Sequence, residues 1–269
     1  MTLLINSCEK YSDLWSGHVK LLERNFPQES FDRILLTDEK CSKDLGSVNI
    51  ISAGSGTEMP ERIKYVLPFI RSEYVLVTLD DYYLIEPVDV RRINALLDAM
   101  DSEKIDYIRL FKRPPSRIKI EGHDSLFLID LNSKKDYHYQ VNLYPGIWRK
   151  SFLEKTLAGV SDAWNYELSL TRTARENNTK CAMTYGKEFV ILDVVRKGKL
   201  LHKANAYFKK HPGIYEGDRK VISRFTELKI DFMTLLKLIF NQSTIDSLKS
   251  FFRRFGVHFY SDGNGRRNS

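Results

Sequence analysis

The sequence is poor in cysteine and has no long apolar run, and each absence removes a class of protein. Its three cysteines, Cys8, Cys41 and Cys181, stand far apart in 269 residues, without the spacing of metal ligands. We expect free thiols in a reducing cytoplasm. No apolar run approaches the roughly 20 residues that a membrane-spanning helix needs. Residues 1–6 carry no basic segment and no cleavage site, so we expect a first strand there and not a signal peptide.

The composition is that of a folded protein with an excess of positive charge. Charged residues make up 29% of the chain and hydrophobic residues 42%, which is ordinary for a globular domain. The length allows one substantial domain with a small appendage. The net charge of +7 indicates an anionic partner, which can be a nucleotide, a membrane surface or a nucleic acid. Charge alone does not choose among them.

Short apolar runs alternate with segments of helical periodicity along most of the chain. The periodic segments predict helices over residues 11–26, 61–70, 88–100, 151–157 and 164–177. The continuous runs predict strands over residues 3–6, 33–38, 48–51, 74–79, 107–110 and 189–195, and a hairpin around 126–129. This order predicts an α/β fold in which helices flank a mostly parallel sheet.

Two adjacent acids, Asp80 and Asp81, directly follow the apolar run that begins at Tyr74. The run is continuous rather than alternating, which is typical of a strand buried on both faces of a parallel sheet. Ligands of open α/β sheets bind beyond the carboxyl ends of such strands. Neighbouring carboxylates repel each other, and Mg²⁺ or Mn²⁺ carrying phosphate oxygens would compensate for that repulsion. The alternative is that both acids merely cap the following loop.

Other predicted strands also end in small or polar residues. Because parallel strands open on one edge of the sheet, we expect these ends to meet near the acids and to line a nucleotide pocket. Their polar groups would hydrogen-bond base and ribose, and the glycines would let the backbone approach closely. The residues concerned are Asn6, Thr37, Asp38, Gly54 and Ser55.

Four segments together carry a family resemblance. They are the acid-ended strand through Tyr82, then residues 87–89 (Pro-Val-Asp), residues 144–150 (Tyr-Pro-Gly-Ile-Trp-Arg-Lys) and residues 164–167 (Trp-Asn-Tyr-Glu). In order and spacing they resemble bacterial GT-A-fold glycosyltransferases, more narrowly the enzymes of capsule and O-antigen synthesis, related in layout to family 2 glycosyltransferases. The resemblance covers roughly residues 1–210. The family's Asp-x-Asp pattern is not literally present, because Tyr83 stands two positions after Asp81.

The resemblance implies a GT-A, Rossmann-like fold and transfer of a sugar from a nucleotide diphosphate donor, with a UDP-sugar as first choice. The acceptor would be a saccharide or a polyprenyl-linked saccharide, and the mechanism inverting. Such transfer needs a general base for the acceptor hydroxyl. Glu167 is the candidate, since burial near a helix start would raise the pKa of a carboxylate. It can instead simply complement the helix N-terminus, and Asp162 is the second candidate base or only the helix cap.

Two further sets of residues complete the expected site. A glycine between basic residues would let a flexible loop close its cations over a departing diphosphate, unless it is only a solvated basic turn; the cations are Arg196, Lys199 and His202. Aromatic faces suit the apolar faces of sugar rings, so the acceptor is expected on the second set, unless Trp148 belongs to the core. That set is Asn142, Tyr144, Trp148, Arg149 and Trp164.

The end of the chain differs in character from the domain expected over residues 1–215. Residues 216–260 contain two amphipathic basic stretches, 230–240 and 245–255. Such helices lie in a membrane interface, and they would anchor the protein on the inner face of the cell membrane. Equally, they would pack on the core or on another subunit of a homo-oligomer. Residues 261–269 are expected to be a disordered tail.

Two other functional classes remain open. A nucleotidyltransferase also pairs acids with metal and phosphate, but it predicts a Gly-rich, basic loop after the first strand, which residues 6–10 lack. A basic nucleic-acid-binding α/β module predicts aromatics interleaved with Lys and Arg on one sheet face. Here the cations gather in turns and in the C-terminal stretches, so we expect no nucleic-acid partner.

Overall fold

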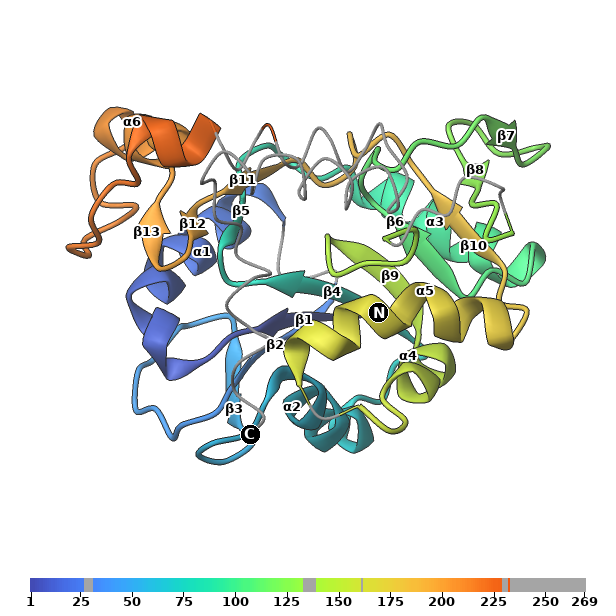
Figure 1. The fold of residues 1–269 in the computed structure, drawn as a ribbon, viewed down its shortest axis with the longest axis horizontal. Helices are drawn as coiled ribbons and strands as arrows, with labels where there is room; N and C mark the ends of the chain where they lie inside the picture. Colours follow the sequence, from blue (N-terminus) through green and yellow to red (C-terminus); the bar gives the residue numbers. More distant parts are fainter. Residues whose placement is uncertain (27–30, 133–138, 161, 229–231, 233–269) are drawn as a thin grey trace, which may run out of the picture. The chain divides into compact units, whose positions relative to one another are not determined.

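The computed structural model describes residues 1–26, 31–132, 139–160, 162–228 and 232. The chain divides into two units, and the first contains residues 1–132 and 138–222. All of the helices and strands named here belong to the first unit (Figure 1). Of the second unit, residues 223–228 and 232 are described, and residues 224–228 are helical.

The elements follow one another in an α/β order. They are β1 (Thr2–Asn6), η1 (Glu9–Tyr11), α1 (Ser12–Asn25), β2 (Asp32–Thr37), β3 (Asn49–Ser52), α2 (Met59–Val66), η3 (Leu67–Phe69), β4 (Tyr74–Leu79), β5 (Tyr82–Leu84), α3 (Val90–Ser102), β6 (Tyr107–Arg109), β7 (Ile118–Lys119), β8 (Phe127–Leu128), β9 (Gly146–Arg149), α4 (Lys150–Thr156), α5 (Ala163–Glu176), β10 (Cys181–Met183), β11 (Ile191–Asp193), β12 (Val195–Arg196), β13 (Lys199–Leu200) and α6 (His202–Lys210).

A nine-stranded sheet in the order β3-β2-β1-β4-β9-β6-β10-β8-β7 forms the centre of the first unit. Strands β1 to β4 are mutually parallel. Strand β9 runs antiparallel to both of its neighbours, β4 and β6, so that β6 has the direction of β4, and β10 is parallel to β6. The predicted fold class is therefore confirmed: helices flank a mostly parallel sheet.

Both faces of the central strands are buried, and successive side chains of each strand point to opposite faces. On one face, Leu4 packs in a cluster with residues of α2, α4 and α5, such as Ile63 and Leu170. On the other face, Leu3 and Ile5 pack in a cluster with residues of α1 and α3. Figure 1 shows these helices covering the sheet. The continuous apolar runs in the sequence reflect this double burial.

Two local predictions are wrong. The strand expected over residues 189–195 is divided into β11, which pairs with β5, and β12, which forms a hairpin with β13. Lys197 and Gly198, with φ of 53° and 72°, make the two-residue turn of that hairpin, so no flexible loop lies between these cations. Trp148 lies in β9.

The predictions for the C-terminal stretches fall largely on residues outside the described part of the chain. Of the appendage expected over residues 216–260, the structure describes residues 216–228 and 232, and the tail at 261–269 is not described. No helix within the described part of the chain is long and apolar enough to cross a membrane.

Candidate active site at the carboxyl edge of the sheet

The parallel strands end together, and backbone hydrogen bonds continue just beyond them. Ser7 N donates to Leu36 O at 2.8 Å, Ala53 N to Thr37 O at 2.8 Å, and Asp80 N to Asn6 O at 3.3 Å. The ends of β1, β2, β3 and β4 therefore meet on one edge. Asp80 and Asp81 lie at the middle of this edge, because β4 is the fourth of the sheet's nine strands.

Asp80 is held in a buried network and is 7% exposed. Ser7 Oγ donates to Asp80 Oδ2, and Trp15 Nε1 donates to Ser7 Oγ at 2.6 Å. His18 Nδ1 lies 3.2 Å from Asp80 O. Burial raises the pKa of Asp80 to about 7, against the hydrogen bond from Ser7, which lowers it. Burial makes the charged form of this carboxylate unfavourable, and a cation bound beside it would stabilise that form.

Asp81 is half-buried as a residue, but its Oδ1 atom is buried and has no hydrogen-bond partner. Burial raises the pKa of Asp81 well above its usual range, and the charges of Asp80 and of Asp193 raise it further. Asp193 is brought there by the pairing of β11 with β5, in which Asp193 stands opposite Tyr82. Three acids thus share this edge of the sheet. A buried carboxylate oxygen without a partner indicates a place for a ligand.

Arg196 supplies positive charge beside these acids. Its Nε and Nη2 atoms donate to Asp193 Oδ2 at 3.0 and 2.8 Å. Burial raises the pKa of Asp81 and of Tyr144, and the charge of Arg196 opposes this rise. Lys199 is exposed in β13, and His202 is half-buried at the start of α6. Among the three predicted cations, Arg196 therefore has described contacts with the acids.

A column of parallel aromatic rings leads away from Asp81. The rings of Tyr82 and Tyr144 stack with centroids 5.4 Å apart and planes within 2°, and the rings of Tyr144 and Phe111 with centroids 4.1 Å apart and planes within 7°. The negative charge of Glu167 adds to the causes, led by burial, that raise the pKa of Tyr82 and of Tyr144. Glu167, half-buried on α5, is therefore close enough to this column for its charge to act on both tyrosines.

Asp162 has the capping role that was its alternative in the sequence. Its Oδ1 accepts a hydrogen bond from Asn165 N at 2.9 Å at the start of α5. It also lines a pocket of about 370 Å³ along α5, together with Asn165, Ser169 and Arg172. Glu167 is not among the residues that line this pocket. Glu167 thus remains the candidate base at the carboxyl edge.

The predicted nucleoside residues gather at the ends of β1, β2 and β3. Asn6 is buried and its Oδ1 has no hydrogen-bond partner. Asp38 accepts from Thr37 Oγ1 and from Glu9 N, and the Glu9 bond holds the pKa of Asp38 below its usual value, although burial raises it. Gly54, with a φ of 109°, and exposed Ser55 follow β3. Polar atoms without partners suit the edge of a base or a ribose.

Arg62 is a residue of this region that the sequence did not suggest. It is 8% exposed on α2, its Nε has no hydrogen-bond partner, and its guanidinium donates to Thr57 O. Its charge lowers the pKa of Asp38 and of Cys8. Helical periodicity marks position 62 only as buried, so no signal in the sequence distinguished it.

The acceptor residues expected from the sequence are separated by strand β9. Because β9 is antiparallel, Tyr144 before it lies at the carboxyl edge, whereas Arg149 stands opposite Tyr74 at the other end of β4. Trp148 is fully buried. Arg149 pairs there with Glu73, Asp101 and Asp106. Trp148 and Arg149 thus lie outside the candidate site, which corrects their assignment to an acceptor.

The two other residues expected to bind the acceptor are Asn142 and Trp164. The side chain of Asn142 is buried in its own turn, where Nδ2 donates to Tyr139 O at 2.9 Å and Oδ1 accepts from Tyr144 N at 3.1 Å. It therefore shapes the segment that carries Tyr144. The side chain of Trp164 lies outside the described part of the structure.

Asp80 and Asp81 fit a divalent metal that binds together with a phosphate-bearing substrate. Among the described residues, no three His, Cys, Asp or Glu side chains gather closely enough to hold a metal ion. Mg²⁺, however, takes one or two protein carboxylates and keeps phosphate oxygens and waters as its other ligands. Asp81, with its unpartnered Oδ1, and Asp80 beside it meet that requirement.

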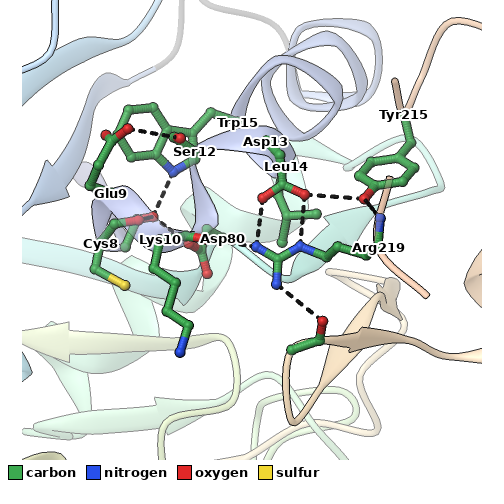
Figure 2. Close-up of polar contacts among 12 residues, drawn as sticks. Cys8, Glu9, Lys10, Ser12, Asp13, Leu14, Trp15, Asp80, Tyr215 and Arg219 are labelled. Atoms are coloured by element: carbon green, nitrogen blue, oxygen red, sulfur yellow. Dashed lines mark hydrogen bonds and ion pairs between the residues drawn. The ribbon is translucent and has the colours of Figure 1, made fainter. Parts of the chain in front are cut away.

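Arg219 completes the surroundings of Asp80 from far along the chain (Figure 2). Its guanidinium pairs with Asp13, lies 4.5 Å from the ring centroid of Tyr11, and lowers the pKa of Asp80. Neither Arg219 nor Asp193 was predicted. Asp193 did have a signal, an acid inside the apolar run 189–195, but an arginine in a polar segment has none.

Comparison with known proteins finds no matching family model and no matching curated protein. Similar solved structures include S. aureus TarS 1–349 in complex with UDP-GlcNAc, at 16% identity over 74% of this chain and 60% of that chain, with a TM-score of 0.48. Mannosyltransferase PcManGT from Pyrobaculum calidifontis, in complex with GDP-Man and Mn²⁺, is 10% identical over 73% and 57% of the two chains, at 0.49.

A cytidylyltransferase from Leptospira borgpetersenii is also similar, at 13% identity over 82% of this chain and 98% of that chain, with a TM-score of 0.44. The chain thus spans about 60% of the TarS 1–349 chain. With TM-scores below 0.5, the function has to be argued from this chain's own residues.

Proposed function

We propose that this chain is a GT-A-type, nucleotide-sugar-dependent glycosyltransferase that binds its donor at the carboxyl edge of the sheet. The observation that carries the proposal is the pair Asp80–Asp81, in which Asp80 is buried and Asp81 has a buried Oδ1 atom without a hydrogen-bond partner. The polar strand ends beside the pair suit a nucleoside. Arg196 and Glu167, whose charges act on Asp81 and on Tyr82, suit a departing diphosphate and an acceptor hydroxyl.

Each group has a defined task in this proposal. Asp38 and Arg62 hold the nucleoside, Asp81 and Asp80 hold a divalent metal on the diphosphate, and Arg196 adds positive charge as that group departs. The metal supplies charge stabilisation when it is bound. Glu167 removes the proton of the acceptor hydroxyl, as an inverting transfer requires.

A binding screen tests the donor site directly. Thermal shift with UDP-, GDP-, CMP- and dTDP-sugars, each with and without Mn²⁺, should show stabilisation by one nucleotide class that Mn²⁺ increases, with UDP-sugars the first choice. Asp81→Asn keeps the volume and removes the charge, so it should abolish the Mn²⁺-dependent part. Asp98→Asn, an exposed acid on α3, is the matched control. The absence of any nucleotide effect in wild type would contradict the proposal.

The reaction class needs a second measurement. A glycosyltransferase releases nucleoside diphosphate from a nucleotide sugar, whereas a nucleotidyltransferase releases inorganic diphosphate from a nucleoside triphosphate and a sugar phosphate. The anomeric configuration of the product, read by NMR, tests the inverting mechanism. A retained configuration would remove the need for Glu167 as base.

We propose a role in bacterial surface polysaccharide synthesis, with the protein attached to the inner face of the cell membrane through residues 230–255. The support is the sequence pattern of those residues, which lie outside the described part of the chain except for residue 232. Basic amphipathic stretches bind anionic leaflets at about 1 kcal/mol per cation. Full-length protein should pellet with phosphatidylglycerol vesicles and be released partly by salt, whereas a chain ending near residue 222 should not pellet.

A further inference from the structure

The carboxyl edge of the sheet continues past the acids to two loops that the proposed chemistry leaves unused. Because β4, β6 and β10 share one direction, the residues after β6 and after β10 emerge on the edge that carries Asp80 and Asp81. Phe111 follows β6 and Tyr185 follows β10. Thr184 N donates to Arg109 O at 2.9 Å, so the two loops leave the sheet side by side.

These two loops are packed together and held in shape. A Cβ atom at Gly186 would stand 3.1 Å from Leu110 O and 3.3 Å from Phe111 Cα, so the backbones are in contact there. Arg109 is fully buried, and its guanidinium donates to Phe111 O at 2.9 Å and to the carbonyls of Pro114 and Gln140. A buried guanidinium bound to backbone oxygens holds the first loop in one conformation.

The exposed charged side chains of these two loops are mostly positive. Residues 111–120 contain four cations and no acid. On the neighbouring loop, Glu188 is already paired with Arg92 at 3.3 Å. Five exposed cations form no ion pair within the described part of the chain. We call them the basic loop surface: Lys112, Arg113, Arg117, Lys119 and Lys187.

We propose that the basic loop surface binds the acceptor and that this acceptor is a phosphate-bearing saccharide. The inference rests on the proposed glycosyltransferase function and names its substrate class. Unpaired cations gathered in neighbouring segments attract anions and raise their local concentration. The aromatic column from Tyr82 through Tyr144 to Phe111 connects this surface with the region of Asp81 and Glu167, so that aromatic rings lie between the cations and the reacting groups.

A charge-reversal pair with a matched control tests this. Lys112→Glu with Arg113→Glu changes the charge by four units on the basic loop surface. Lys64→Glu with Arg71→Glu makes the same change on exposed residues of α2 and of the segment before β4. Fluorescence anisotropy measures binding of phosphorylated dextran and of neutral dextran of the same length, over a series of salt concentrations. Binding of UDP, of phosphatidylglycerol vesicles and of single-stranded oligothymidine is measured in parallel.

Wild type and the control pair should bind phosphorylated dextran about tenfold or more tightly than neutral dextran, with an affinity that falls as salt rises. The 112/113 pair should lose this preference while it keeps UDP and vesicle binding. Equal loss in both pairs, equal binding of the two dextrans, loss of vesicle binding in the 112/113 pair alone, or tighter binding of oligothymidine than of phosphorylated dextran would each overturn the inference. A wild type that binds no nucleotide would contradict the proposed function instead.

Discussion

Arg219 and Asp13, 206 positions apart in the sequence, form a bidentate ion pair on the flank of the candidate site. Nε lies 2.7 Å from Oδ2 and Nη2 lies 2.5 Å from Oδ1 of Asp13. Nη2 also donates to Lys10 O, and Tyr215 Oη donates to Asp13 (Figure 2). The segment after α6 is thereby attached to the start of α1, next to Tyr11 and Asp80.

The Asp13–Arg219 pair should contribute measurably to stability, because the Arg219 side chain is 11% exposed and that of Asp13 30%. A double-mutant cycle with Asp13→Asn and Arg219→Gln should give a coupling energy of about 1–3 kcal/mol in urea unfolding. Lys20 and Glu216 join the same two segments but are exposed, so the same cycle on that pair should give about 0–1 kcal/mol. Equal couplings in the two cycles would contradict the role of the buried geometry.

Gly17, one turn further along α1, lets the segment after α6 pack closely against the helix. A Cβ there would stand 1.8 Å from Ile214 O and 2.9 Å from Tyr83 Oη, so Gly17→Ala must displace residues 211–219. Helix propensity alone predicts stabilisation by about 1 kcal/mol. We expect destabilisation by about 1–3 kcal/mol and faster proteolysis after α6. Ser16→Ala, at an exposed position of α1, should show neither effect.

Asp80 should oppose stability at neutral pH. Its pKa of about 7 in the folded chain exceeds the usual 3.8. The folded state therefore holds this proton more tightly, and the contribution of Asp80 is full below pH 3.8 and is lost as pH rises to 7. Asp80→Asn should raise the melting temperature at pH 8, by about 2–4 °C per kcal/mol relieved, and much less at pH 4.

The same Asp80→Asn variant should lose transfer activity, so that stability and function change in opposite directions. Asp98→Asn should change neither. A melting temperature of the Asp80→Asn variant that stays equal to wild type at pH 8 would mean that the acid is already compensated in the free protein. His18, whose pKa burial lowers to about 4, acts in the opposite sense as pH falls, and comparison at each pH cancels its effect.

Glu167→Gln keeps the volume and hydrogen bonding of the side chain but removes its basicity. Turnover should fall by about 10²–10⁴, with donor binding by calorimetry unchanged. Glu176→Gln, at an exposed position of the same helix, is the matched control and should stay active. Full activity of the Glu167 variant would transfer the role of base to another group or remove it altogether.

Local patterns in the sequence were sufficient to predict most of the sheet. Strand β4 was expected over residues 74–79 and lies there, because its two buried faces require a continuous apolar run. The common edge of Asn6, Thr37 and Asp80 followed from the direction of parallel strands. The predicted cap at Asp162 is also present, since it depends only on residues three positions apart.

The direction of β9 and the partners of its residues were decided by tertiary structure alone. An antiparallel strand between two parallel ones has the same apolar pattern as a parallel strand, yet it places Tyr144 at the site and Arg149 at the far end of β4. Asp193 and Arg219 reach the acids through pairings across more than 100 and 130 positions of the chain. The sequence by itself determined which segments bury apolar surface, because that depends on neighbouring residues. Which charges meet depends on the direction and pairing of distant strands, and only the folded chain sets these.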